Sequence, residues 1–208
     1  MRDSTVDYPA EPWDLRGHGY VSAWLVPVSA LPPLPEGVRP VSVFGRAVVG
    51  TAFVDYLPGG LLPYHELLAA VVVRQGVRVG LTITDIWVDS PASRAGGREL
   101  WGIPKELAEF SLSHEPSFTG TASDGTVLAD ARVAGLSRGL KLPFPVRGTV
   151  LQELGGALAR TPIRARGTIH LAMGTWRTGG GLKWLSAYRP FLTVAARNFQ
   201  LRFGPRRR

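Results

Sequence analysis

Residues 41–73 read VSVFGRAVVGTAFVDYLPGGLLPYHELLAAVVV, and this stretch decides the fold class. Two apolar runs, 41–56 and 61–73, flank the sequence Leu-Pro-Gly-Gly at positions 57–60. The first run is rich in valine and aromatic residues, and the second ends in three consecutive valines, which suit a pleated, half-buried surface. Proline fixes its own φ and glycine adopts a positive φ without steric cost, so the short link predicts a tight turn. We therefore predict a β-hairpin and a fold built mainly from strands.

Further strands are predicted on both sides of this hairpin. Residues 20–28 and 77–88 are apolar runs bounded by turn residues. Asp124-Gly125 lies between the segments 111–122 and 126–133 and predicts a second hairpin. Over residues 163–173, apolar and polar side chains alternate with period two, which predicts a half-exposed strand.

Helix signals are few. Ser90 followed by Pro91 predicts a short helix that runs to about Leu100. Three leucines at positions 151, 154 and 158 have helical spacing, although two glycines interrupt them. Residues 1–19 are expected to form an extended arm and residues 204–208 a basic tail. The sum is one mainly antiparallel, β-rich α+β domain over residues 1–208, with one or two short helices.

Composition excludes several classes of site. The 208-residue chain has no cysteine, which excludes disulfides, thiolate metal sites and cysteine nucleophiles. Its four histidines lack paired ligand spacing, so we expect no metal. The formal charge of +8 suits either nucleic acid or anionic substrates, but the arginines are dispersed and no nucleic-acid-binding motif is present. We expect no nucleic-acid partner.

We also expect no membrane association. The N-terminal residues lack the apolar core of a secretory signal. The longest apolar run, residues 67–73, is too short to cross a bilayer. A cytoplasmic protein is therefore expected.

Lysine is scarce in this basic chain. Of 24 lysines and arginines, only Lys105, Lys141 and Lys183 are lysines. A guanidinium stays protonated in proteins, whereas an ammonium loses its proton when its surroundings lower its pKa. Each lysine therefore raises the question of whether its amine is used chemically. Lys105 has the most specific surroundings of the three.

Residues 97–105 read GRELWGIPK, and Tyr64-His65-Glu66 lies upstream of them. Together these two motifs and their spacing resemble the acetoacetate decarboxylase family. The resemblance covers about a quarter of the chain directly. It implies an antiparallel, cone-like β-barrel and a homo-oligomer.

The resemblance also implies a Schiff-base lyase without a cofactor. The substrate would be a β-keto or 2-oxo acid. With a β-keto acid, the amine of Lys105 would attack the ketone, and the resulting iminium would accept electrons when the substrate carboxylate leaves as CO2. Glu66 would orient water or substrate, or transfer protons. The alternatives are an aldolase–dehydratase-type reaction through the same iminium, and a small-molecule-binding member without catalysis.

Other site residues follow from the same resemblance. Tyr64, Arg98 and Trp101 are candidate substrate-binding residues, although Arg98 equally suits holding a loop and Trp101 suits core packing. His18, which occupies the place of an arginine in the family, is a further candidate substrate-binding residue, although it equally suits a loop histidine. Thr51 occupies the place of a second glutamate. Glu66 also suits a structural ion pair with an arginine such as Arg98.

The residues next to Lys105 bear on the charge of its amine. Trp101, Ile103, Leu107 and Phe110 provide an apolar setting that disfavours the ammonium. A helical turn beginning at Pro104 would lower the pKa of Lys105 further. Glu106, where the family has a second lysine, would instead favour the ammonium unless it points away or pairs with an arginine.

Overall fold

The computed structural model describes residues 6–135, 137–141 and 145–207. Strands dominate this part of the chain, and one α-helix, α1 (Pro91–Trp101), lies between β6 and β7. The longer strands are β1 (Trp13–Pro27), β4 (Arg46–Tyr56), β5 (Tyr64–Gln75), β6 (Arg78–Val88), β9 (Phe118–Ser123), β10 (Val127–Ala134), β12 (Val146–Leu154), β13 (Ala157–Thr178) and β14 (Pro190–Phe203). The shorter elements are β2 (Arg39–Pro40), β3 (Ser42–Val43), β7 (Lys105–Leu107), β8 (Glu109–Ser113), β11 (Leu140–Lys141) and the 3-10 turns η1 (Val28–Ala30) and η2 (Gly180–Leu185).

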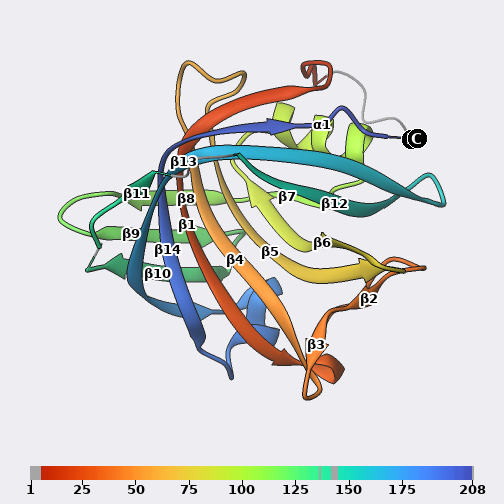
Figure 1. Ribbon diagram of the computed structural model, residues 1–208. Coiled ribbons are helices and arrows are strands. Elements are labelled where there is room, and N and C mark those ends of the chain that lie inside the picture. The colour runs from red at the N-terminus through yellow and green to blue at the C-terminus, as the bar shows by residue number, and fades with distance from the viewer. Residues whose placement is uncertain (1–5, 136, 142–144, 208) are drawn as a thin grey trace.

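Seven strands close into a ring (Figure 1). Their order is β12-β6-β5-β4-β1-β14-β13, and β13 returns to pair with β12. All contacts between neighbours are antiparallel except that between β12 and β6, a single parallel pair, Val150 with Leu81. Side chains reinforce this weak joint. The amide of Gln152 bonds both backbone groups of Ile83, and Thr82 Oγ1 donates to Leu151 O at 3.0 Å.

The second half of β13 leaves the ring and continues into a second layer. There it pairs with β10, followed by β9 and β8. This layer and η2 cover the outer face of β1, β4 and β5. Trp24, Phe53, Phe118, Leu128 and Leu182 are fully buried between them.

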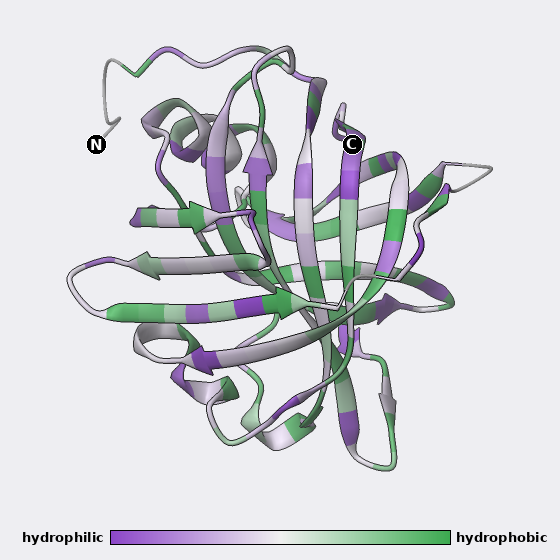
Figure 2. Ribbon diagram, turned by 90° about the vertical axis from the view of Figure 1, so that its left-hand side faces the viewer, coloured by the Kyte–Doolittle hydropathy of each residue, from purple (hydrophilic) through white to green (hydrophobic). Residues whose placement is uncertain are grey.

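A separate apolar cluster fills the ring. It includes Trp13, Leu15, Val54, Ile86 and Trp101. The two clusters lie on opposite faces of the same strands because side chains alternate across a sheet. Hydrophobic and hydrophilic residues accordingly interchange along the ribbons in Figure 2.

The structure confirms the main sequence predictions. The hairpin at residues 57–60 joins β4 to β5, and Asp124-Gly125 joins β9 to β10. The helix begins at Pro91, with Ser90 Oγ accepting from Ser93 N at 3.2 Å, and ends at Trp101 before the left-handed Gly102. The strand predicted over 163–173 is part of β13.

Three predictions were wrong. The proposed arm ends earlier than residue 19, because Trp13 and Leu15 are buried in β1. The leucines at 151, 154 and 158 lie in the hairpin of β12 and β13, turned by Gly155 and Gly156, and not in a helix. The described part of the basic tail is bonded to the body, since Arg207 N donates to Arg160 O at 2.8 Å. Arg208 and residues 1–5 lie outside the described residues.

No helix among the described residues has the length and apolar character needed to span a membrane.

Candidate active site

Strand β5 brings two site residues into the ring. Alternation along the strand directs Tyr64 and Glu66 inward and His65 to the other face. His65 Nδ1 there contacts Asp89 Oδ2 at 2.6 Å. Tyr56 on β4 lies directly opposite Tyr64 and also points inward, so its hydroxyl donates to Glu66 Oε1 at 3.1 Å.

Helix α1 and strand β7 bring the lysine to the same place. Lys105 begins β7, which pairs with β6 in parallel with Lys105 beside Ile86. Its side chain runs along α1 and passes over Gly97. A Cβ atom at position 97 would lie 2.7 Å from Lys105 Cδ, so only glycine leaves room for the lysine stem.

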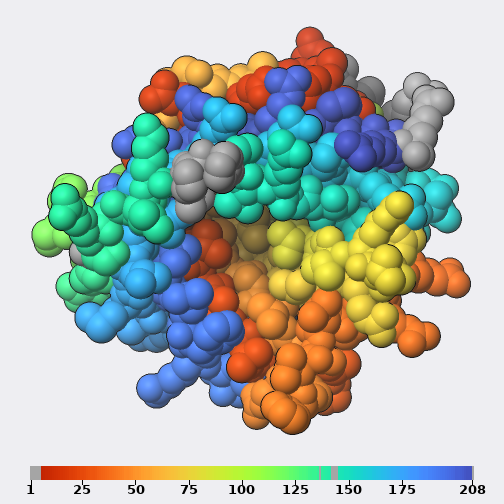
Figure 3. Space-filling view, viewed as in Figure 1, coloured from red at the N-terminus to blue at the C-terminus, as the bar shows by residue number. Residues whose placement is uncertain are grey.

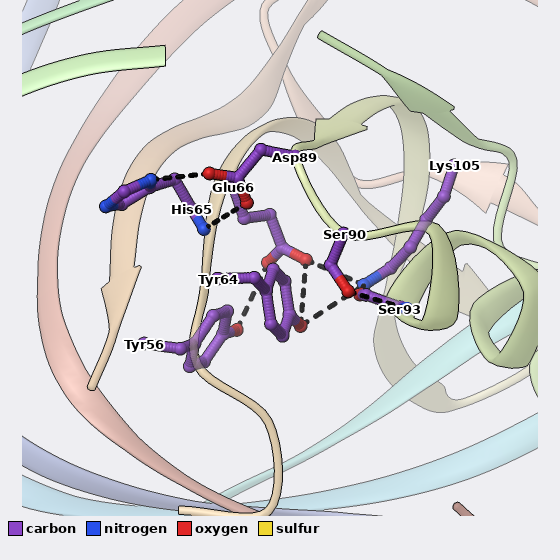
Figure 4. A network of polar contacts seen from close by, with 8 residues as sticks. All are labelled: Tyr56, Tyr64, His65, Glu66, Asp89, Ser90, Ser93 and Lys105. Carbon is purple, nitrogen blue, oxygen red and sulfur yellow. Dashed lines mark hydrogen bonds and ion pairs between the residues drawn. The ribbon is translucent and has the colours of Figure 1, made fainter. Parts of the chain in front are cut away.

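The amine of Lys105 lies among three oxygen atoms (Figure 4). Its Nζ is 2.8 Å from Glu66 Oε2, 2.9 Å from Ser93 Oγ and 3.3 Å from Tyr64 OH. Lys105 and Glu66 are both buried, with 4 % of each residue exposed. The pair is therefore a buried ion pair with hydrogen bonds on both partners, as such pairs require.

The ion pair outweighs burial in setting the charge of the amine. Burial alone lowers the pKa of Lys105, but the Glu66 charge and the hydrogen bonds with Glu66 and Tyr64 raise it above its ordinary value. The apolar setting predicted from the sequence does disfavour the ammonium, but the Glu66 charge opposes it. Pro104 also begins no helix, since Lys105 is already in β7.

The two tyrosines remain neutral hydrogen-bond donors. Burial, followed by the Glu66 charge, raises the pKa of Tyr64 to about 12. The same two causes raise the pKa of Tyr56 well above its ordinary value. Neither hydroxyl adds a negative charge to the site near neutral pH.

A cavity of about 150 Å³ adjoins this group inside the ring. The amine, carboxyl and hydroxyl groups in its lining belong to Lys105, Glu66, Tyr56 and Tyr64. The remainder of the wall is apolar, and Trp13, Leu68, Ile83, Val150 and Phe203 belong to it. Trp101 thus forms pocket wall, while its indole nitrogen bonds Glu11 at 2.7 Å.

Arg98 and Glu106 lie outside the cavity. Arg98 Nε donates to the carbonyl oxygen of Lys105 at 2.6 Å, and its terminal nitrogen pairs with Glu106. Arg98 thus holds the backbone of the lysine in place. Glu106 is exposed and pairs with Arg98, so the structure does not support it as a direct modulator of the Lys105 amine and agrees with the predicted alternative, pairing with an arginine. Nor does Glu66 pair with Arg98.

His18 and Thr51 face away from the cavity. In β1 the inward positions next to His18 are glycines 17 and 19, and His18 Nδ1 accepts from Asn198 N at 3.2 Å on the other side. Thr51 accepts from Trp24 Nε1 at 2.9 Å within the outer core. The structure therefore places neither His18 nor Thr51 in the site, although both align with site residues of the family.

Two residues of the site were missed in the sequence. Ser93 precedes Gly97 by four residues, which places both on one face of α1, toward Lys105. Tyr56 follows Val54 by two residues on β4, so both side chains point into the ring. The face of α1 that carries Ser93 and the face of β4 that carries Tyr56 can be predicted only when the position of the helix and the register of the hairpin are known. No group of residues that suits a metal ion is present in the described ranges.

The ring and its buried lysine–glutamate pair define a barrel with an ion-paired amine beside an apolar cavity. A family model described as acetoacetate decarboxylase matches residues 7–147, which is 141 of the 208 residues. The chain belongs to the acetoacetate decarboxylase family.

Curated relatives match over a shorter region. Acetoacetate decarboxylase 3 of Mesorhizobium japonicum is 35 % identical over 77 residues, covering 36 % of this chain and 30 % of the relative. Acetoacetate decarboxylase of Paraburkholderia phytofirmans is 37 % identical over 86 residues, covering 40 % and 31 %. The chain thus matches about a third of the length of these relatives.

Solved structures match over nearly the whole chain. Acetoacetate decarboxylase from Legionella pneumophila aligns with a TM-score of 0.72 at 19 % identity, covering 100 % of this chain and 91 % of that one. The enduracididine biosynthesis enzyme MppR aligns with a TM-score of 0.70 at 18 % identity, covering 99 % and 90 %. These likenesses confirm the predicted cone-like barrel fold.

Proposed function

We propose that the protein is a lyase that forms an imine between Lys105 and a β-keto or 2-oxo acid, and that decarboxylation of the acetoacetate type is its simplest reaction. The observation that carries the proposal is the 2.8 Å contact between Lys105 Nζ and Glu66 Oε2 beside an apolar cavity. Family membership supports the same chemistry. The small-molecule keto acid is thus the proposed partner.

In this proposal Glu66 activates the amine. A proton passes from the Lys105 ammonium to the Glu66 carboxylate, which leaves two neutral groups in a low-dielectric interior. The free amine adds to the ketone carbon, and loss of water gives an iminium. Ser93 Oγ and Tyr64 OH, both within hydrogen-bond distance of Nζ, hold the nitrogen in position.

Decarboxylation suits the apolar wall. When the bond between the α-carbon and the carboxylate breaks, its electron pair moves into the iminium and forms an enamine, and the charged carboxylate becomes neutral CO2. An apolar cavity favours a step that removes charge. Glu66 returns its first proton to the departing hydroxyl group when the iminium forms, and it then takes up a second proton from solvent and gives it to the enamine carbon. Hydrolysis of the imine releases the ketone and restores the lysine.

The same iminium also supports aldol and dehydration chemistry. One of the similar structures is MppR complexed with the condensation product of pyruvate and imidazole 4-carboxaldehyde. An aldolase–dehydratase-type reaction is thus the alternative within enzymes.

A second candidate is a small-molecule-binding protein without catalysis. The raised pKa of Lys105 favours it, because a permanently protonated amine cannot attack a ketone. The two candidates differ in whether Lys105 ever forms a covalent adduct.

Borohydride trapping separates them. The protein is incubated with acetoacetate or with pyruvate, reduced, and digested for mass spectrometry. We expect a reduced adduct on Lys105 and none on Lys141 or Lys183, which are exposed internal controls. Absence of an adduct with both acids, or an equal adduct in Lys105→Arg, would overturn the lyase and leave the binding protein.

Two further expectations remain proposals: a homo-oligomer and a cytoplasmic location.

A further inference from the structure

The inner face of the ring continues beyond the catalytic cavity as an open apolar trough. We define the trough by six residues on β1, β4, β13 and β14: Val21, Leu25, Val48, Leu171, Leu192 and Val194. Figure 3 shows a hollow at this place, bordered by the blue β14, the yellow β6 and the teal strands β12 and β13.

The strand register joins the trough to the cavity. Leu171 pairs with Val194, Val194 with Val21, and Val21 with Ala52. Ala52 pairs in turn with Leu68, which lines the cavity together with Lys105. Paired residues share a face of the sheet, so this row runs across five strands and ends in the cavity.

The trough is exposed, although the other face of the same strands is covered. Val21 is 37 %, Leu192 45 % and Leu171 58 % exposed, whereas Trp24 and Phe53 on the covered face are 1 % or less. Soluble proteins rarely expose contiguous apolar surface without a binding role.

The six residues of the trough are all apolar, and the β5 side of the adjoining cavity is uncharged beyond Glu66. Beyond Glu66, the inward positions of β5 are Leu68, Ala70 and Val72. Between Glu66 and Val72 the strand rises about 20 Å at roughly 3.3 Å per residue. An apolar, uncharged surface of this kind fits a hydrocarbon chain.

We propose that the trough binds the apolar tail of the keto acid whose ketone reaches Lys105, so that the preferred substrate has a medium-length acyl chain and not the single methyl group of acetoacetate. This inference rests on the proposed function. A linear tail is favoured over a second copy of the chain because the row continues into a cavity of about 150 Å³, which a protein surface cannot enter.

Binding of simple carboxylates tests the trough without imine chemistry. Butanoate, hexanoate, octanoate and decanoate contain no ketone, so calorimetric titration measures only how the chain binds. We expect the Kd to fall about fourfold for each added methylene group. Leu171→Asp, at an exposed position in the trough, should remove this dependence on length. Val77→Asp, in the exposed turn between β5 and β6, should leave it unchanged.

Two outcomes would overturn the inference. One is a Kd that does not change with chain length. The other is a length dependence that Leu171→Asp leaves intact, which would place the chain elsewhere. If Leu171→Asp instead changes only the sedimentation coefficient, a second copy covers the trough and the tail does not. These carboxylates form no imine, so their binding tests only the trough. The borohydride experiment tests the proposed lyase independently.

Discussion

Lys105 Nζ and Glu66 Oε2 lie 2.8 Å apart in the interior of the ring, where burial and charge act on the amine in opposite directions. The carboxylate favours the protonated lysine and, in the proposed reaction, is the nearest acceptor for the proton that must leave before the amine can react. Both properties depend on the same contact, so a change to either residue should affect the stability of the fold and also the charge of the amine.

Removing one partner of this pair should destabilise the fold. In Lys105→Met the Glu66 carboxylate stays buried without its cation, and we expect a loss of about 3–5 kcal/mol in the free energy of unfolding, measured with urea. The double variant Lys105→Met/Glu66→Gln should regain most of that loss. The exposed pair of Arg177 and Asp130 serves as the control, since Arg177→Met should cost less than about 1 kcal/mol. Equal losses in the two pairs would contradict a buried, energetically coupled pair.

Removing the carboxylate should lower the pKa of Lys105. Without the Glu66 charge, burial becomes the dominant influence on the amine, and burial disfavours the ammonium. We expect acylation of Lys105 in Glu66→Gln to begin at lower pH than in the unchanged protein, followed by mass spectrometry. The exposed Lys183 gives the internal reference, because its profile should not move. A Lys105 profile that stays in place would show that Glu66 does not set its charge.

The stabilisation from the ion pair should persist through neutral pH. The folded-state pKa of Lys105 is raised above 10.5, so its contribution is complete below pH 10.5 and is lost as the pH rises through the folded value. Urea denaturation should therefore show a loss of stability in alkaline solution that is smaller in Lys105→Met. An equal alkaline loss in both proteins would assign it to other groups.

Gly97 should be required for the position of the lysine. A methyl group in Gly97→Ala would lie 2.7 Å from Lys105 Cδ, and we expect at least a tenfold slower formation of the borohydride-trapped adduct. Gly96→Ala is the matched control, because it makes the same change in the helix but meets the ring of Trp13 at 2.6 Å and not the lysine. Slower trapping in Gly96→Ala alone would contradict this role for Gly97.

The joint between β12 and β6 should depend on Gln152. Its side chain satisfies both backbone groups of Ile83, so Gln152→Leu leaves a buried donor and a buried acceptor without partners. We expect a loss of about 2–4 kcal/mol in the free energy of unfolding. Glu153→Leu, at the exposed next position, should change it by less than about 0.5 kcal/mol.

The sequence predicted those features that depend on local chemistry. Ser90 and Pro91 begin a helix wherever they occur together with helix-forming residues, and Pro-Gly-Gly turns a chain without tertiary help. The spacing of Glu66 and Lys105 indicated the family, and the structure brings the two side chains together. Periodicity misled at leucines 151, 154 and 158, because their spacing spans a hairpin turn and not one element.

The direction in which a side chain points, and the residue with which it pairs, could not be predicted in the same way. His18 lies one residue from the inward positions of β1, and a shift of one residue moves a side chain to the other face. The effect of Glu106 depended on whether Arg98 lay within reach, which the fold of α1 against β7 decides. Ser93 and Tyr56 enter the site only through tertiary packing.

The pairing of β1 with β14 also bears on how the protein is made. The first long strand of the chain is hydrogen-bonded to the last, from Trp13 beside Phe203 to Trp24 beside Pro190. During synthesis the ribosome releases β1 long before its partner exists, so the ring cannot close until β14 has emerged. Until then the apolar edges of β1 and β13 are unprotected, and nascent chains of this protein are expected to depend on chaperones.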